Sequence, residues 1–344
     1  MKVRWGVIGA GGIADRRTLP GLIKAENAEL VAVMEVCPQR TEELRVKYGA
    51  KRGYTSEDEL LADPEIDAVY VATPVPHHTR QALKVAAAGK HLLLEKPAAL
   101  TVADGREIAD ACRAAEVLAA AGFMMRYHAY HQAMREIVQS GKLGQIVSCR
   151  AQLTCWYPDM DNCWRQQKSL SGGGAMMDMG IHCLDLLQYI TGSKVKRIAG
   201  LAATSTFKYD VDDSAAALIE LENGAFGFVD ANFNIPDAAA EGRLEIYGTG
   251  GSLLARGTIS QVEGGVLNAV LADSSKGYDA QQERNEVQET AVKVDFGNMY
   301  QKEIESFGRS ILEGLPVEVP LEDALHNQEL VEKFYQSAQT GVFM

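Results

Sequence analysis

The fold is decided by the opening stretch VRWGVIGAGGIA, residues 3–14. Residues 3–8 are typical of an apolar strand, and the turn that follows fits the pattern G-x-G-x-x-G/A. Gly9 permits a tight turn, Gly11 lets the backbone approach a pyrophosphate, and Ala14 allows a helix to pack closely on the strand. A helix that begins here offers free N–H groups to phosphates. The stretch therefore predicts the first strand, turn and helix of a dinucleotide-binding domain.

Beyond this turn, short apolar strands alternate with helical stretches as far as residue 122. The expected strands are Val3–Ile8, Leu30–Glu35, Ala68–Ala72, His91–Leu94 and Val117–Gly122, and the expected helices are Gln39–Tyr48, His78–Ala88 and Val102–Ala115. Near-continuous apolar strands separated by helices imply a parallel sheet that is buried on both faces. Residues 1–122 are therefore predicted to form a doubly wound α/β Rossmann domain.

The pattern changes in residues 123–344. After a helical stretch, Tyr130–Ser140, come longer segments in which apolar and polar residues alternate with period two. They are Ile146–Trp156, Val195–Lys208, Ala215–Glu222, Ala225–Phe233 and Arg243–Tyr247, and two helices, Met299–Leu312 and Leu321–Ser337, follow. This predicts an α+β domain with a large, open, mostly antiparallel sheet. Such a sheet is a natural surface for substrate binding and oligomerisation, and we expect a homodimer or homotetramer.

An acidic residue supports the dinucleotide assignment. Glu35 ends the second strand, 24 residues after Gly11, where a carboxylate binds the adenosine ribose hydroxyls and repels a 2′-phosphate. That favours NAD over NADP, but Arg40 is placed to bind a 2′-phosphate, so NADP stays open. The alternative for Glu35 is a solvated acid at a strand end. The predicted dinucleotide contacts of this region are Gly9, Gly11, Gly12, Ile13, Glu35 and Arg40.

Two further motifs carry chemistry. Lys96 follows an apolar strand in the tripeptide Glu95-Lys96-Pro97, at the strand end where ligands bind in a parallel sheet. A lysine beside a cationic nicotinamide can exchange protons, although most lysines are surface residues.

Asp178 and His182 follow a run of glycines at helical spacing i and i+4, so they share one face. Histidine suits the removal of a hydroxyl proton, and a neighbouring carboxylate stabilises its cation; the alternative is a surface ion pair.

These motifs together resemble the Gfo/Idh/MocA family of glucose–fructose oxidoreductase, inositol dehydrogenase and rhizopine-catabolism proteins. The resemblance covers essentially the whole chain. It rests on the turn at residues 9–14, TPVPHH at 73–78, EKP at 95–97, the Gly172–Gly174 run with Asp178 and His182, and EIYGTGG at 245–251. The resemblance implies a Rossmann domain followed by an α/β domain with an open sheet.

The resemblance also assigns roles. It makes Lys96 the catalytic lysine that hydrogen-bonds the reacting oxygen, and His182, paired with Asp178, the proton acceptor. It places Thr73, Pro74, His78, Glu95 and Lys96 at the cofactor. It places Arg126 and Tyr127 at the domain crossover, within reach of the cofactor or the substrate, and Arg126 is expected to contact the substrate. The segment before the glycine run is expected to face the substrate through Tyr157, Trp164 and Arg165, although packing inside the domain explains such aromatic residues about as well. Asp185, one turn after His182, either orients the histidine or only borders the site.

Composition excludes several partners. With a net charge of −12 and a pI near 5.1, neither nucleic acid nor an anionic membrane is expected as the main partner. The six cysteines are dispersed and predict reduced thiols of a cytoplasmic protein without an export signal. Cys155, Cys163, His182 and Cys183 lie close in sequence, but their spacing fits no familiar zinc pattern, so no metal is predicted.

The sequence therefore predicts an NAD(P)-dependent dehydrogenase or reductase acting on a ring secondary alcohol of a sugar, inositol or glycoside. The alternative is a glycoside-processing enzyme with tightly bound, internally recycled NAD, because its redox half-reaction needs the same residues. A non-catalytic dinucleotide sensor is a third hypothesis, and the joint presence of Lys96, Asp178 and His182 counts against it.

Overall fold

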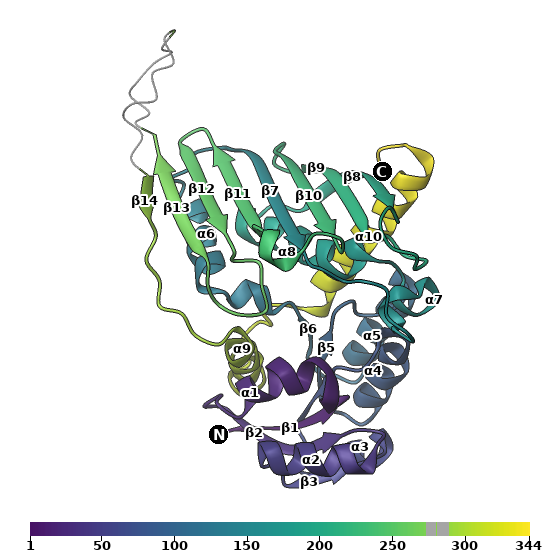
Figure 1. The fold of residues 1–344 in the computed structure, drawn as a ribbon. Helices are drawn as coiled ribbons and strands as arrows, with labels where there is room; N and C mark the ends of the chain where they lie inside the picture. Colours follow the sequence, from purple (N-terminus) through teal and green to yellow (C-terminus); the bar gives the residue numbers. More distant parts are fainter. Residues whose placement is uncertain (273–279, 281–288) are drawn as a thin grey trace. The chain divides into compact units, whose positions relative to one another are not determined.

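The computed structural model describes residues 1–272, 280 and 289–344 of the chain. Contacts between residues divide it into two compact units. The first unit consists of residues 1–124, 167–172 and 298–329, and the second of residues 125–166, 173–297 and 330–344. Each unit is built around a sheet of its own (Figure 1).

A six-stranded parallel sheet forms the centre of the first unit, with the strand order β3–β2–β1–β4–β5–β6. The strands are β1 (Val3–Ile8), β2 (Ala28–Met34), β3 (Arg52–Tyr54), β4 (Ala68–Val71), β5 (His91–Glu95) and β6 (Ala119–Gly122). The prediction of a doubly wound parallel sheet is confirmed. The sequence pattern did not reveal β3, because a three-residue edge strand is too short to show a period.

Helices and single turns connect these strands and cover the sheet. They are η1 (Ala10–Thr18), α1 (Leu19–Leu22), α2 (Pro38–Tyr48), α3 (Glu57–Leu61), η2 (Val75–His77), α4 (His78–Ala87), α5 (Val102–Ala114), α7 (Lys168–Ser171) and α9 (Met299–Glu313), where η marks a 3-10 or π-helical segment. α9 comes from the far end of the sequence and contacts α1, β1 and η1. Its Ile304 and Phe307 join the core around Trp5, whose ring lies 6.0 Å from that of Phe307. This late helix thus completes the core beneath the dinucleotide turn.

The second unit contains an eight-stranded sheet with the order β14–β13–β12–β11–β7–β10–β9–β8. The strands are β7 (Ile146–Thr154), β8 (Val195–Ala203), β9 (Ser214–Leu221), β10 (Phe226–Asn232), β11 (Arg243–Gly248), β12 (Gly251–Arg256), β13 (Val266–Leu271) and β14 (Glu289–Ala291). β7 and β10 pair in parallel, and the other neighbours are antiparallel. The predicted large, mostly antiparallel sheet is confirmed.

The remaining helical segments are η3 (Met124–Tyr127), α6 (Ala129–Gln139), η4 (Trp164–Gln166), η5 (Met176–Gly180), α8 (Ile181–Thr191), η6 (Asp237–Ala239) and α10 (Leu321–Thr340), whose residues are divided between the two units. Within the described ranges, no helix combines the length and the apolar character needed to cross a bilayer.

One face of the eight-stranded sheet is packed and the other is exposed. On β10, Val229 and Ala231 are buried, whereas Phe226 and Phe228 are exposed to 55% and 46%. α8 contacts β7 and β10, and in Figure 1 α6 lies behind the strands. The period-two alternation of the sequence therefore reflects a sheet that is covered on one side only.

Two buried histidines lie close together at the start of α6. His128 and His131 have no exposed surface, and their rings are 4.6 Å apart. The two ring nitrogens of His131 lie 2.7 Å from the Met125 carbonyl oxygen and 3.1 Å from the Thr258 hydroxyl. Burial, together with the neighbouring His128, lowers the pKa of His131 to about 3. The His131 ring is therefore neutral in the folded protein.

We expect the stability that His131 contributes to be lost as the pH falls. The histidine pKa in the unfolded chain is about 6.5, so below that pH the unfolded state binds a proton that the folded state does not take up until about pH 3. Between pH 7 and pH 4 the free energy of unfolding should fall by about 3 kcal/mol from this group.

Melting curves across this pH range test the assignment. The melting temperatures of the wild type and His131→Gln should converge as the pH falls, whereas the exposed-site control His77→Gln should keep a constant offset from the wild type. A pH-independent gap between the wild type and His131→Gln would contradict a neutral, buried His131.

Candidate active site

The turn after β1 leaves an open helix N-terminus. Gly9 has φ of 79°, in the left-handed region, and a Cβ there would collide with Thr73 and with the Ala72 backbone. η1 begins at Ala10, and its cap residue Gly9 makes no side-chain hydrogen bond. The Gly11 N–H in its first turn is bonded to Glu35. A Cβ on Gly12 would meet nothing within 4 Å. The left-handed Gly9 and the open space beside Gly12 fit the pyrophosphate of a dinucleotide.

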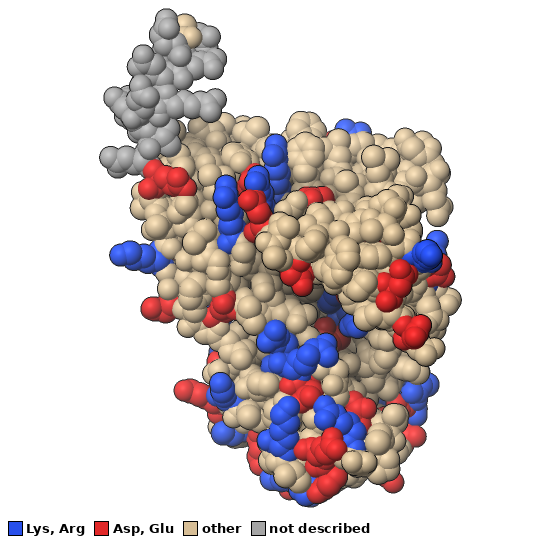
Figure 2. Space-filling view, in the orientation of Figure 1, with Lys and Arg blue, Asp and Glu red and all other residues tan. Residues whose placement is uncertain are grey.

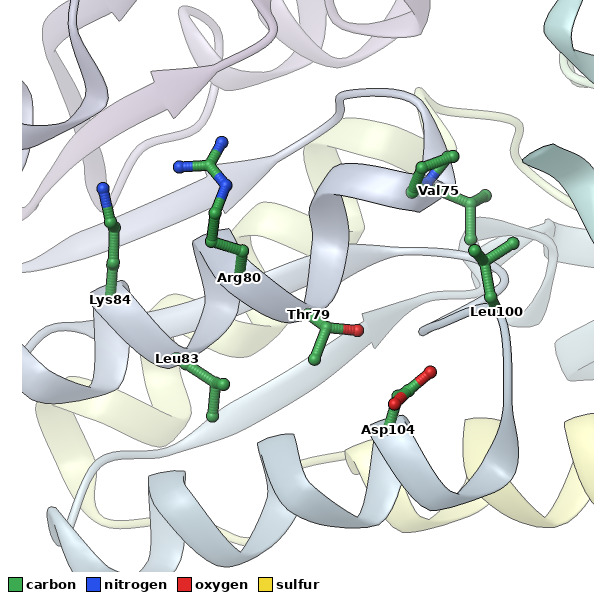
Figure 3. Close-up of a pocket in the computed structure, with 8 residues that line it drawn as sticks. Val75, Thr79, Arg80, Leu83, Lys84, Leu100 and Asp104 are labelled. Atoms are coloured by element: carbon green, nitrogen blue, oxygen red, sulfur yellow. The ribbon is translucent and has the colours of Figure 1, made fainter. Parts of the chain in front are cut away.

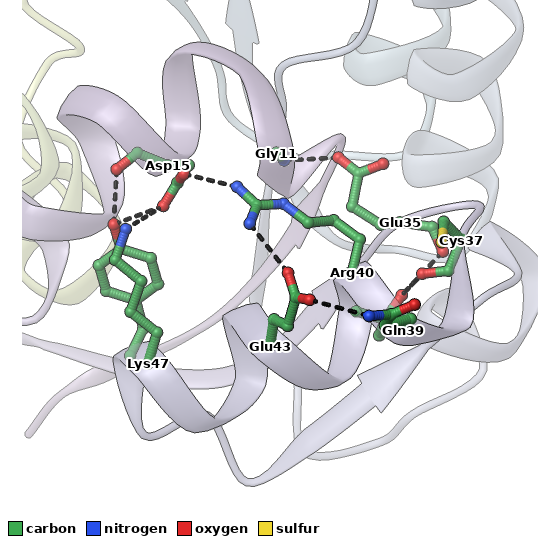
Figure 4. Close-up of polar contacts among 10 residues, drawn as sticks. Gly11, Asp15, Glu35, Cys37, Gln39, Arg40, Glu43 and Lys47 are labelled. Carbon is green, nitrogen blue, oxygen red and sulfur yellow. Dashed lines mark hydrogen bonds and ion pairs between the residues drawn. The ribbon is translucent and has the colours of Figure 1, made fainter.

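The acid and the cation predicted at the ribose lie beside this turn (Figure 4). Glu35 accepts a hydrogen bond of 2.5 Å from the Gly11 N–H, so its carboxylate points back to the glycine turn. Arg40 is paired with Asp15 at 2.7 Å and with Glu43 at 3.1 Å. The one cation predicted to accept a 2′-phosphate is therefore held by two carboxylates, which a phosphate would have to displace.

His78 connects the chain segments that follow β4 and β5. Its ring is 1% exposed, with Nε2 2.8 Å from the Thr73 carbonyl oxygen and Nδ1 3.0 Å from that of Pro97. Burial lowers the pKa of His78 to about 4, so the ring is neutral and donates one hydrogen bond at a time. The sequence predicts His78 at the cofactor, and that stays a prediction. The two ring nitrogens contact the backbone next to Pro74 and Lys96, two other residues of the predicted site.

Lys96 stands at the carboxyl end of β5, where it is half-buried. The peptide bond between Lys96 and Pro97 is cis. The preceding Glu95 receives hydrogen bonds from the Tyr70 hydroxyl and, at 3.2 Å, from the Lys96 backbone N–H. Tyr70 is fully buried. The backbone at Lys96 is therefore tied through Glu95 to the interior of the sheet.

In the second unit, Asp212 holds the glycine run. Its Oδ1 accepts hydrogen bonds from the Gly174 N–H at 2.8 Å and the Tyr335 hydroxyl at 2.7 Å, and its Oδ2 accepts one from the Met176 N–H at 3.0 Å. A Cβ on Gly173 would collide with the Tyr335 ring, and one on Gly174 with the Asp212 backbone. The glycines thus let backbone N–H groups reach a buried carboxylate that fixes the start of η5.

Sequence analysis missed Asp212 and Tyr335. The available signal was a pair of adjacent acids, Asp212 and Asp213, directly before the apolar strand β9. A buried carboxylate needs hydrogen-bond donors, and a glycine run has them to offer. The bond between Asp212 and Gly174 spans 38 residues, and no local pattern shows such a pairing.

Asp178 and His182 come from one continuous helical segment. Asp178 lies in the π-helical η5, and His182 is the second residue of α8, which follows without a break. The Asp178 side chain is 31% exposed and His182 is 5% exposed. The Asp212 clamp therefore also fixes where this segment begins, and with it both side chains.

The loop predicted to face the substrate lies next to Asp178. The Arg165 Nε is 3.8 Å from the Asp178 carboxylate, and its guanidinium stacks over the Trp164 ring at 4.4 Å. The Tyr157 hydroxyl is 3.1 Å from the Cys163 sulfur, and its ring packs on Phe233 at 4.9 Å. Arg165 and Asp178 thus form a polar pair, with the Trp164 ring stacked against Arg165. The Tyr157 ring also packs inside this unit, against Phe233.

Arg126 and Asp185 form a buried ion pair. The Asp185 carboxylate receives the Arg126 Nε at 2.9 Å and its Nη2 at 2.5 Å, and the two side chains are 1% and 7% exposed. This pairing joins η3 to α8 inside the second unit. It gives Arg126 and Asp185 a role in holding α8, separate from the substrate contact predicted for Arg126.

A groove in the first unit, of about 540 Å³, lies between α4 and α5 (Figure 3). It is lined by Val75, Pro76, Thr79, Arg80, Leu83, Lys84, Leu100 and Asp104. Its two cations are already paired, Arg80 with Glu57 and Lys84 with Asp58 at 2.7 Å. None of the residues predicted to be catalytic lines it. Among the described residues, no group of three or more His, Cys, Asp or Glu side chains is arranged to hold a metal ion.

Comparison with known proteins identifies the family. Residues 3–123 match the profile of the oxidoreductase family with an NAD-binding Rossmann fold, and residues 131–254 match that of the GFO/IDH/MocA C-terminal domain. The chain belongs to the Gfo/Idh/MocA family of oxidoreductases. Its cofactor is therefore a nicotinamide dinucleotide, and its reaction is a dehydrogenation or reduction.

Individual family members are similar over most of the chain. The 1,5-anhydro-D-fructose reductase of Ensifer adhaerens is 31% identical over 90% of this chain and 88% of that protein. The myo-inositol 2-dehydrogenase of Thermotoga maritima is 28% identical over 74% and 75%. Two solved structures share the fold over the whole chain and 99% of their own: aldose-aldose oxidoreductase from Caulobacter crescentus (TM-score 0.89, 24% identity) and levoglucosan dehydrogenase with NADH and levoglucosan (0.87, 22%).

The Asp212 clamp predicts a severe effect of one added methyl group. Gly174→Ala places a Cβ against the Asp212 backbone, which cannot move without releasing the start of η5. We expect a loss of about 3 kcal/mol of stability or more, at the upper end for overpacking. Gly264→Ala is the control, because its Cβ would meet nothing within 4 Å. Equal melting temperatures for the two variants would show that the close approach at Gly174 is not a constraint.

Proposed function

We propose that the protein is an NAD-dependent dehydrogenase or reductase acting on a ring secondary alcohol or ketone of a monosaccharide, cyclitol or glycoside. Residues 1–122 bind the dinucleotide, and residues 123–344 bind the substrate. The observation that carries the proposal is the pair of motifs Lys96, at the end of β5, and His182, on the helix that Asp212 fixes. The reactions named for the relatives, on anhydrofructose, inositol and levoglucosan, support this substrate class.

Each polar residue then has a defined task. A bound nicotinamide supplies the hydride acceptor or donor. Lys96 donates a hydrogen bond to the reacting oxygen, and His182 takes the hydroxyl proton as the carbon is oxidised. Asp178 stabilises the imidazolium that results, and Arg165, beside it, binds a neighbouring hydroxyl. The half-exposed Tyr157 and Trp164 provide apolar surface for a sugar ring, as proposed from the sequence.

Substitution of the two proton-handling residues tests this assignment. Lys96→Ala and His182→Ala should each lower turnover at least about 100-fold, the low end for a lost acid–base group. Binding of NAD, measured by calorimetry, should persist because neither residue belongs to the glycine turn. The assay is a panel of sugars, inositols and glycosides followed at the nicotinamide absorbance. Full activity in either variant would contradict the proposal.

Cofactor preference follows from Glu35 and Arg40. Glu35 repels a 2′-phosphate, and Arg40 is held by Asp15 and Glu43, so NAD is the preferred cofactor. We expect Glu35→Ser to raise kcat/KM with NADP relative to NAD at least tenfold, because about 1.4 kcal/mol of repulsion is enough for that ratio. Arg40→Ala in the same background should reverse the gain. An unchanged cofactor ratio in Glu35→Ser would remove Glu35 from the specificity determinants.

The reactions named for the relatives are dehydrogenations and reductions, and no observation favours the internally recycled cofactor. We further propose a cytoplasmic location, which the six free cysteines support because a reducing compartment preserves thiols. The net charge of −12 disfavours nucleic acid and anionic membranes as partners.

The exposed face of the eight-stranded sheet supports a homodimer or homotetramer. Leu201, Leu218, Phe226 and Phe228 lie on neighbouring strands β8, β9 and β10, and all are at least 38% exposed. Figure 2 shows that most of the surface over this sheet is uncharged, with the charged side chains gathered in a band over the middle strands. An apolar face of this kind is covered in solution by an oligomeric contact.

A charge on this face should dissociate the oligomer. We expect Phe228→Asp to reduce the mass seen by sedimentation velocity to that of a single chain, because the partner would have to bury a carboxylate. Val36→Asp, on an 80% exposed residue of the first unit, is the matched control and should keep the wild-type mass. An oligomer that survives Phe228→Asp unchanged would place the contact elsewhere.

A further inference from the structure

Glu303 is a buried acid that the proposed reaction does not use. It lies on α9, and its side chain is 2% exposed. Neither of its carboxylate oxygens has a hydrogen-bond partner among the described residues. A buried carboxylate without a partner is among the most unfavourable groups in a protein, so its presence in the core needs an explanation.

Several polar groups of the first unit lie near Glu303. The carboxylate of Glu95 is close enough to act on Glu303 by charge. Tyr70, from β4, donates to Glu95 and accepts a hydrogen bond of 3.0 Å from Thr18, the last residue of η1. Tyr300 lies one turn before Glu303 on α9, and its buried hydroxyl also has no partner among the described residues. Residues of η1, β4, β5 and α9 therefore meet in one buried cluster.

Two carboxyl groups in this cluster cannot both be charged at modest cost. Glu95 receives hydrogen bonds from Tyr70 and from the Lys96 N–H, which stabilise its ionised form. Glu303 receives none. Burial, and then the charge on Glu95, raise the pKa of Glu303 well above its usual value. Arg16 and Arg17 of η1 also lie close enough to act on Tyr300 by charge.

We propose that Glu303 is a neutral carboxylic acid in the folded enzyme and a positioning residue that keeps a single negative charge in the pair Glu95–Glu303, next to Lys96. The inference rests on the proposed function only in that Lys96 is the lysine that exchanges protons. A second negative charge close to Glu95 would make both buried carboxylates costly and would also act on neighbouring charged groups. The neutral Glu303 adds no such charge.

Infrared spectroscopy tests the protonation state without any substrate. At neutral pH the wild type should show the carbonyl stretch of a protonated carboxylic acid, and Glu303→Gln should lose it. Glu313→Gln, on an exposed residue of the same helix, should retain it. The absence of this band from the wild type, or its persistence in Glu303→Gln, would overturn the proposal.

A second variant tests the coupling and keeps the proposal falsifiable if Glu303→Gln does not fold. Glu95→Gln removes the neighbouring charge, so the acid band should disappear on alkaline titration at a lower pH than in the wild type. An unchanged midpoint would show that the two carboxyl groups do not share a charge.

Competitive chemical labelling of Lys96 at neutral pH, read by mass spectrometry, gives a second measurement. Labelling should proceed equally in the wild type and in Glu303→Gln, because a neutral Glu303 adds no charge beside Glu95. A difference between these two proteins would mean that Glu303 is ionised. Because neither the infrared band nor labelling needs turnover, a failure of this proposal is distinct from a failure of the proposed reaction.

Discussion

Neighbouring strands of a parallel sheet have their carboxyl ends at the same edge of the sheet. The first unit depends on this constraint. β1, β4 and β5 are neighbours in the sheet and run in the same direction. Their carboxyl ends therefore bring together the glycine turn, Thr73 and Lys96, which are far apart in sequence. Two of them depend on the backbone conformation: Gly9 is left-handed, and the turn at Lys96–Pro97 is contacted by the His78 ring. The apolar strands fix the position of this edge, and the polar residues of the candidate site lie along it.

In the second unit, a buried carboxylate fixes the start of the helical segment that carries Asp178 and His182. A helix that starts in the interior leaves N–H groups without partners, and Asp212 accepts two of them at the start of η5. Glycines are required there because any side chain would collide with Asp212 or Tyr335. The ion pair of Arg126 with Asp185 then holds α8 three residues beyond His182. His182, which we propose as the proton acceptor, is thus carried by a segment fixed on both sides.

The parts of the fold that the sequence predicted are those with local periodicity. The apolar strands, the amphipathic helices and the alternating segments all lay close to their expected positions, and the Gly11–Glu35 relation follows from a motif of fixed spacing. The short strand β3 has no period to detect. The return of α9 to the core of the first unit depends on contacts between Phe307 and Trp5, at opposite ends of the chain.

The sequence indicates which residue types make up the candidate site, but it says less about the partners of these residues. Lys96, Asp178 and His182 stand in motifs that sequence spacing reveals. The partners of His78 and Arg126 depend on which groups tertiary packing places beside them, and these turned out to be backbone carbonyls and Asp185. The burial of Asp212 and Glu303 could not be predicted for the same reason. Most acidic residues are exposed, so an acid in a sequence is expected at the surface.

We propose that one amine and one imidazole act on the same substrate oxygen beside the nicotinamide. A crystal structure with NAD and the substrate identified by the assay panel is the decisive test. We expect Lys96 Nζ and a ring nitrogen of His182 each to lie about 3 Å from one hydroxyl oxygen, with its carbon about 3–3.5 Å from the nicotinamide ring. A complex in which either side chain is bonded elsewhere, or in which the dinucleotide does not lie on the glycine turn, would contradict it.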